Sequence, residues 1–144
     1  AKEGEYIGKQ IARDVAGPSV VKRMEMAIDI GLGTGTSKEK MVEIGHRIGA
    51  GLHVAEAIPS AFGIFAAYNG DAMGSIIGAV NVGYDTDTVA TMSGALAGAL
   101  NGADAYPSHF LPTLEKANHL EIEKLAKDLT EIAKKRFEAG KESQ

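Results

Sequence analysis

The sequence contains no cysteine among its 144 residues, so it can form neither disulfides nor metal sites with thiolate ligands. It also lacks an excess of positive charge. The net charge of −4 argues against general nucleic-acid binding, which needs a basic face. The polar start, Ala1–Glu5, does not resemble a signal peptide. These absences favour a cytoplasmic protein.

Several other signals are missing. The apolar stretch from Ala72 to Leu100 is interrupted by Asp85 and Asp87, so it does not supply the ~20 apolar residues of a membrane span. The sequence has no Gly-x-Ser-x-Gly elbow and no His-Glu-x-x-His motif. The glycine-rich segment Gly31–Lys38 lacks the Gly-Lys-Ser/Thr order of a phosphate-binding loop. We therefore expect no membrane contact, serine hydrolase site or zinc protease site.

Hydrophobic residues make up 44% of the chain, which is enough for a core. No stretch alternates with period two, so strands are not expected. We predict a single all-α domain over residues 1–144, built as an orthogonal helical bundle of seven or eight helices. The expected helices are Glu5–Val15, Val20–Ile30, one from the Thr36 cap to about Ile48, Leu52–Tyr68, Ala72–Val82, Val89–Gly102, and an amphipathic helix from about Asn118 to Gly140.

Local signals predict where some helices start and stop. Thr36 with Glu39 three residues later has the pattern of a capping box, and Asp71 caps the helix after the Asn69-Gly70 turn. Pro59 predicts either a kink or a new helix start inside its apolar segment. Glycines at 94, 98 and 102 form a flat stripe that predicts close packing against a neighbour. Residues 101–112 are expected to be a loop or a broken helix.

One short stretch carries the candidate chemistry. Asp85, Asp87 and Thr88 place three oxygen donors within four residues, directly before an apolar helix. Two crowded carboxylates are costly beside an apolar element unless a cation offsets them, and Mg²⁺ prefers such oxygen ligands. Helix capping is the alternative, but one cap needs only one such residue. We predict that Asp85, Asp87 and Thr88 bind a divalent metal ion.

These residues also carry a resemblance to a known family. The run Ala79–Ala90 (AVNVGYDTDTVA), followed by Ser93–Ala99, resembles the carboxy-terminal signature of the ADP-ribosylglycohydrolase family. Its relatives include the enzyme that removes ADP-ribose from dinitrogenase reductase, and the J1 crystallins. Glu56–Ala61 resembles the helix before this signature, and Tyr106-Pro107 resembles the stretch after it.

The resemblance implies a fold, an activity and a metal site. The family has an all-α fold with two metal ions, Mg²⁺ or Mn²⁺, and Asp85, Asp87 and Thr88 match its carboxy-terminal ligands. Its chemistry is hydrolysis of the glycosidic bond at C1″ of ADP-ribose, in ADP-ribosylated protein or a small ADP-ribosyl compound. The resemblance names no catalytic or substrate-binding residue in this chain, because the family's general base comes from its amino-terminal part.

The chain departs from the family in length. Family members are roughly twice as long, and their acidic amino-terminal ligand motif and glycine-rich substrate loop have no match here. The chain is therefore expected to be the carboxy-terminal portion of a longer enzyme, inactive alone, and its start at alanine agrees with this. It would need the missing amino-terminal half or a complementing chain. Two alternatives are a half-length subunit that completes its site with a partner, and a non-catalytic structural protein resembling the crystallins.

Overall fold

A computed structural model describes residues 17–142 of the chain. The chain divides into two compact units, residues 1–106 and residues 107–144, and each is described by itself. The helix predicted over Glu5–Val15 lies outside the described residues. That the 144 residues form a single domain stays a prediction.

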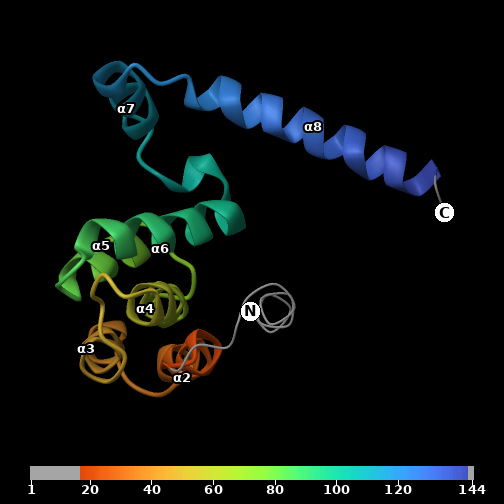
Figure 1. Ribbon diagram of the computed structural model, residues 1–144. Coiled ribbons are helices and arrows are strands. Elements are labelled where there is room, and N and C mark those ends of the chain that lie inside the picture. Colours follow the sequence, from red (N-terminus) through yellow and green to blue (C-terminus); the bar gives the residue numbers. More distant parts are fainter. Residues whose placement is uncertain (1–16, 143–144) are drawn as a thin grey trace. The chain divides into compact units, whose positions relative to one another are not determined.

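The all-α prediction is confirmed, because residues 17–142 contain helices and no strand. In the first unit, Figure 1 shows α2, α3 and α4 nearly end-on while α6 runs across the view, which is an orthogonal arrangement. The helices are α2 (Val20–Leu32), α3 (Ser37–Arg47), α4 (Val54–Ala67), α5 (Ala72–Asn81), α6 (Thr86–Asn101), the 3-10 helix η1 (Ala103–Ala105), α7 (Phe110–Asn118) and α8 (Ile122–Glu142).

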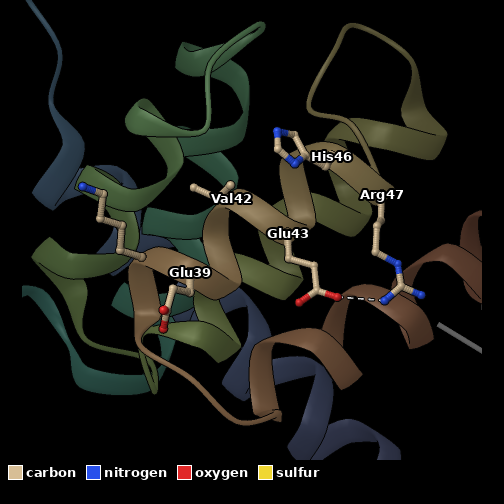
Figure 2. A pocket seen from close by; sticks show the side chains of 6 residues that line it. Glu39, Val42, Glu43, His46 and Arg47 are labelled. Carbon is tan, nitrogen blue, oxygen red and sulfur yellow. Dashed lines mark hydrogen bonds and ion pairs between the residues drawn. The ribbon is translucent and has the colours of Figure 1, made fainter.

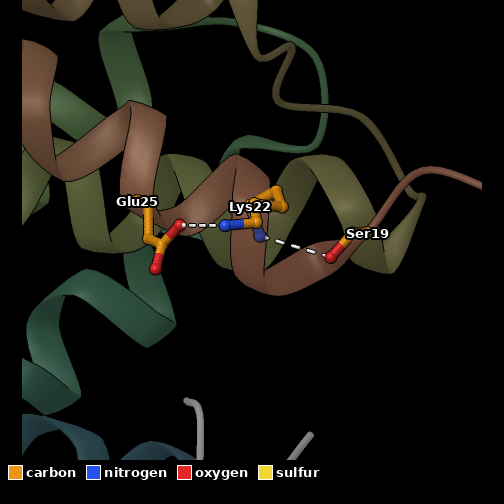
Figure 3. Close-up of polar contacts among 3 residues, drawn as sticks. All are labelled: Ser19, Lys22 and Glu25. Carbon is orange, nitrogen blue, oxygen red and sulfur yellow. Dashed lines mark hydrogen bonds and ion pairs between the residues drawn. The ribbon is translucent and has the colours of Figure 1, made fainter.

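The predicted helix caps at Thr36 and Asp71 are confirmed. The Thr36 side chain accepts the Glu39 backbone N–H, and the Glu39 carboxylate accepts the Thr36 N–H at 2.8 Å, so the capping box of α3 is complete. Asp71 caps α5 by accepting the Gly74 N–H at 2.6 Å. At α2, Ser19 accepts the Lys22 N–H, and Lys22 also pairs with Glu25 (Figure 3).

The capping box of α3 also depends on pH. Hydrogen bonds to Thr36, first to its backbone and then to its side chain, lower the pKa of Glu39. Because the folded-state pKa is lowered, this contribution to stability is present above the ordinary pKa of glutamate. It is lost as the pH falls through the folded-state pKa.

Helix α4 is the centre of the first unit, since it contacts α2, α3, α5 and α6. Small residues allow the neighbouring helices to approach it closely. A Cβ added at Gly31 of α2 would clash with the carbonyl oxygen of Gly63 of α4 and come within 2.8 Å of the Ala66 Cβ. The buried core is composed of Ala27, Met41, Ile44, Ile48, Ala50, Ala57, Ala61, Ile64, Ala67, Ala79 and Val89.

Pro59 lies inside a single continuous α4, so the alternative that a new helix begins at Pro59 is wrong. Proline has no N–H, which leaves the carbonyl four residues earlier, that of Ala55, without its helical donor. Arg23 of α2 replaces this donor, because its Nε donates to the Ala55 oxygen at 2.6 Å. The same guanidinium also donates to the carbonyl oxygen of Ile48. A long-range hydrogen bond therefore lets α4 continue through the proline.

The three evenly spaced glycines at 94, 98 and 102 play two different structural roles. A Cβ at Gly94 would lie 3.1 Å from the Ile76 side chain of α5, and one at Gly98 would lie 3.3 Å from the Tyr106 ring. These two glycines therefore allow close packing, as predicted. Gly102 instead ends α6 with a positive φ of 83° and has open space around it. The Tyr106 hydroxyl donates to the Gly94 carbonyl at 2.5 Å, and burial raises the pKa of Tyr106.

Two buried serines allow a matched test of hydrogen bonding in the core. Ser75 is fully buried, and its hydroxyl has no hydrogen-bond partner among the described residues, whereas the Ser93 hydroxyl donates to the Ala61 carbonyl at 3.1 Å. We expect Ser75→Ala to raise the free energy of unfolding by about 1 kcal/mol and Ser93→Ala to lower it by a similar amount. Urea denaturation followed by circular dichroism measures both. Both substitutions replace serine with alanine inside a helix, so both gain the same helix propensity. Equal changes in the free energy of unfolding for the two variants would therefore contradict the expectation.

The second unit contains α7 and α8. The prediction of a loop or broken helix over residues 101–112 fits as far as residue 109, where η1 and turns follow α6, but it is wrong for residues 110–112, because α7 begins at Phe110. Pro112 is the third residue of α7, where the missing N–H costs no helical hydrogen bond. Helix α8 is the predicted amphipathic helix, but it runs on to Glu142, so the expected end at Gly140 is wrong. Its apolar residues Leu125, Leu129 and Ile132 are exposed.

Candidate metal-binding turn

The three predicted ligands lie in the turn from α5 to α6 and in the first turn of α6. The backbone reverses through two residues with positive φ, Gly83 at 90° and Tyr84 at 59°. Glycine adopts this conformation freely, but tyrosine does so at a cost of roughly 1–2 kcal/mol. The Tyr84 side chain is 85% exposed. Asp85 then occupies the N-cap position of α6, and Asp87 and Thr88 follow within the helix.

Among the described residues, the side chains of the three predicted ligands form no hydrogen bond or ion pair. Asp85 makes no side-chain cap hydrogen bond, although it stands at the N-cap position. Within the part of the chain that the structure describes, the carboxylates of Asp85 and Asp87 and the hydroxyl of Thr88 form no hydrogen bond or ion pair with another described residue. Asp71 differs, because its carboxylate caps α5. Capping hydrogen bonds therefore do not account for the two carboxylates of the turn.

The turn is held in place through its backbone. The Asp85 N–H donates to the Ala50 carbonyl at 3.0 Å, which ties the turn to the loop between α3 and α4. That loop is itself anchored, because Ser60 donates to the Gly49 carbonyl and Glu56 accepts the Gly51 N–H at 3.1 Å. The sequence reasoning did not identify Glu56 as a site residue. Two signals could have indicated it, its position just after the glycine pair at 49 and 51 and its place at the start of the segment Glu56–Ala61 that resembles the family.

The chemistry of these donors fits a hard divalent cation. Asp85 is half-buried, and Asp87 and Thr88 are exposed, so oxygen atoms from three residues are accessible at one helix start. Mg²⁺ is commonly held by one or two carboxylates together with water and substrate oxygens. No cluster of three or more His, Cys, Asp or Glu side chains suited to a metal occurs in residues 17–142. The turn thus fits one side of a metal site, and its role as ligand set stays a prediction.

A hollow on the surface of the first unit is a different feature. It has a volume of about 490 Å³ and is lined only by residues of α3 (Figure 2). Its side chains include Val42 and the ion pair of Glu43 with Arg47 at 2.8 Å, and all of them lie one or two turns apart on the same helix. A groove between exposed side chains of one helix does not enclose a ligand. We therefore assign the candidate site to the acidic turn.

The described residues form an all-α protein, and a turn rich in side-chain oxygen atoms stands at the start of α6. Each helix in residues 17–142 is too short or too polar to cross a lipid bilayer. Residues 5–139 match the sequence profile of the family described as ADP-ribosylglycohydrolase. The chain belongs to the ADP-ribosylglycohydrolase family, as the resemblance predicted.

A similar curated protein is the uncharacterized protein YegU of Escherichia coli (strain K12). It is 28% identical over 121 residues, which cover 82% of this chain. The match covers 35% of YegU, so the chain spans about a third of the length of this relative. A comparison with solved structures found no match.

Proposed function

We propose that this chain contributes the carboxy-terminal metal ligands of a hydrolase that cleaves the glycosidic bond of ADP-ribose conjugates. The observation that carries the proposal is the acidic turn, whose two carboxylates have no partner among the described residues. Family membership supports the reaction class. The substrate would be an ADP-ribosylated protein or a small ADP-ribosyl compound, and the cation Mg²⁺ or Mn²⁺.

The residues of the turn would hold the cation through oxygen. Asp85 and Asp87 would supply negative charge, Thr88 would supply a neutral oxygen, and the positive amino end of α6 would stabilise a carboxylate there by about 0.3–1 kcal/mol. When bound, a divalent cation supplies positive charge that can orient ribose hydroxyls and activate water for attack. The hydrogen bond from the Asp85 N–H to Ala50 keeps the turn in one position before substrate arrives.

We also propose that other polypeptide completes the site. Two carboxylates and one hydroxyl do not make a two-metal centre, and the chain matches about a third of YegU. The remaining ligands and the general base would come from an amino-terminal half or from a complementing chain. We call this chain, joined to or assembled with that polypeptide, the complete enzyme.

The proposal predicts that Asp87→Ala in the complete enzyme lowers release of ADP-ribose at millimolar Mg²⁺ by at least about tenfold, because it removes a metal ligand. The matched control is Asp71→Ala, which removes an acidic cap from the start of α5 and leaves the turn intact. We expect the control to cost about 1 kcal/mol of stability and to leave the rate unchanged. Equal rates for the wild type and Asp87→Ala would reject a metal role for the turn. Absence of any ADP-ribose release by the wild type would favour the non-catalytic alternative.

A further inference from the structure

A single peptide group connects Glu56 to the candidate metal-binding turn. The carbonyl of Ala50 accepts the Asp85 N–H at 3.0 Å. The N–H of the same peptide group belongs to Gly51, and it donates to Glu56 Oε2 at 3.1 Å. The carboxylate, the peptide and the backbone of Asp85 therefore form one continuous chain of hydrogen bonds. Glu56 is therefore linked to the turn through this peptide.

The Glu56 carboxylate lies close to two glycines of the loop. Glu56 is half-buried in the first turn of α4. A Cβ at Gly49 would come within 2.9 Å of Glu56 Oε2, and one at Gly51 within 2.7 Å. A side chain at either position would therefore displace the carboxylate from where it now lies. A φ of 81° gives Gly49 a second reason to be glycine.

The rest of the loop is also held by hydrogen bonds and burial. The Ile48 carbonyl accepts a hydrogen bond from Arg23 of α2, and the Gly49 carbonyl accepts one from Ser60 of α4. Ala50 is completely buried. The peptide between Ala50 and Gly51 is the part of this loop that forms a hydrogen bond with the turn.

The charge of Glu56 should strengthen the bond to Asp85. A hydrogen bond to an ionised acceptor is roughly twice as strong as a neutral one, and linked hydrogen bonds polarise one another. The Gly51 N–H donates to a carboxylate, so the Ala50 carbonyl becomes a better acceptor for the Asp85 N–H. Metal ligands function only when they are held within about 0.5 Å of their productive positions. A stronger hydrogen bond to the Asp85 N–H should therefore favour metal binding.

We propose that Glu56 is a positioning residue for the metal ligands of the turn, acting through the peptide between Ala50 and Gly51. The inference rests on the proposed function, because it assumes that Asp85 and its neighbours bind a divalent cation. It adds a residue from another helix, α4, on which the affinity for the cation depends. A purely structural Glu56 would affect folding stability without affecting the affinity of correctly folded protein.

The test uses Glu56→Ala and Glu56→Gln in the complete enzyme. Manganese affinity is read from the electron paramagnetic resonance signal of free Mn²⁺. Glu56→Ala should weaken binding about tenfold, and Glu56→Gln should recover only part of the affinity, because its amide oxygen can still accept the Gly51 N–H but carries no charge. Hydrogen exchange of residues 83–88, measured without metal, should be faster in Glu56→Ala than in Glu56→Gln.

Glu39→Ala is the matched control. Glu39 occupies the same position at the start of α3 and also accepts a backbone N–H, but its partner is Thr36. We expect this variant to lose stability while keeping wild-type Mn²⁺ affinity and wild-type exchange over residues 83–88. The control therefore separates the effect of losing any glutamate from the first turn of a helix from the effect of losing the link to Asp85.

The outcomes distinguish the two proposals. Wild-type enzyme that does not bind Mn²⁺ overturns the proposed function. Wild-type enzyme that binds Mn²⁺ while Glu56→Ala binds it equally well overturns the role of Glu56 and leaves the proposed function standing. If Glu56→Ala does not fold, Glu56→Asp takes its place, since it keeps the charge but is too short to reach Gly51. Unchanged affinity in Glu56→Asp then overturns the positioning role.

Discussion

Gly31→Ala is expected to lower the free energy of unfolding of the first unit by about 2 kcal/mol. The new Cβ would press against the Gly63 carbonyl oxygen and lie 2.8 Å from the Ala66 Cβ and 3.0 Å from the Ala67 nitrogen. Two of these atoms belong to the backbone of α4, which cannot rotate away as a side chain can. Overpacking of this kind costs up to about 3 kcal/mol, and the better helix propensity of alanine returns only about 1 kcal/mol.

Urea denaturation of the wild type and the variant measures this effect. Gly17→Ala is the control, because nothing lies within 4 Å of a Cβ at that glycine, and its stability should change by less than about 0.5 kcal/mol. Gly63→Ala should resemble Gly31→Ala, since its Cβ would meet the Ala27 carbonyl oxygen at 2.8 Å. Wild-type stability in both variants would mean that α2 and α4 do not cross this closely.

Arg23→Met is expected to lower the free energy of unfolding by about 3 kcal/mol. The variant keeps an apolar side chain of similar length but leaves the carbonyls of Ala55 and Ile48 without the guanidinium. Both residues are buried, and each buried acceptor left without a donor costs about 1–3 kcal/mol. The control is Arg47→Met, because the pair of Arg47 with Glu43 is exposed and should contribute less than about 1 kcal/mol.

A double-mutant cycle tests the reason for this cost. Pro59→Ala restores an N–H that can donate to the Ala55 carbonyl within α4, so that carbonyl no longer depends on Arg23. Arg23→Met should then cost about 1 kcal/mol less in the Pro59→Ala background than in the wild type. Strictly additive effects would show that the arginine does not substitute for the hydrogen bond that proline removes.

Much of the first unit follows from local sequence. Thr36 with Glu39 and Asp71 were predicted as caps from their residue types and spacing, and they cap α3 and α5. These contacts span three residues, so their partners can be found in the sequence itself. Helix α7 was missed because Pro112 suggests a break unless its place in the first helical turn is known.

The candidate site could be predicted only in part. Asp85, Asp87 and Thr88 were named as metal ligands from their crowding before an apolar helix, and this role stays a prediction. Glu56 was named only as the start of a segment that resembles the family and not as a site residue, although Asp85 contacts the peptide that Glu56 holds. Residues 56 and 85 belong to different helices, and no spacing rule connects them.

The sequence by itself determined that this chain is helical, where several of its helices are capped, and that it belongs to a family defined by the signature around Asp85. Only the tertiary structure decided how α4 passes through Pro59, which glycines seat a neighbouring helix, and which peptide supports the acidic turn. The physical reason is the separation along the sequence over which each interaction acts. Propensity and capping act between residues three or four apart, whereas the partners of Arg23, Glu56 and Asp85 are set by how the helices pack.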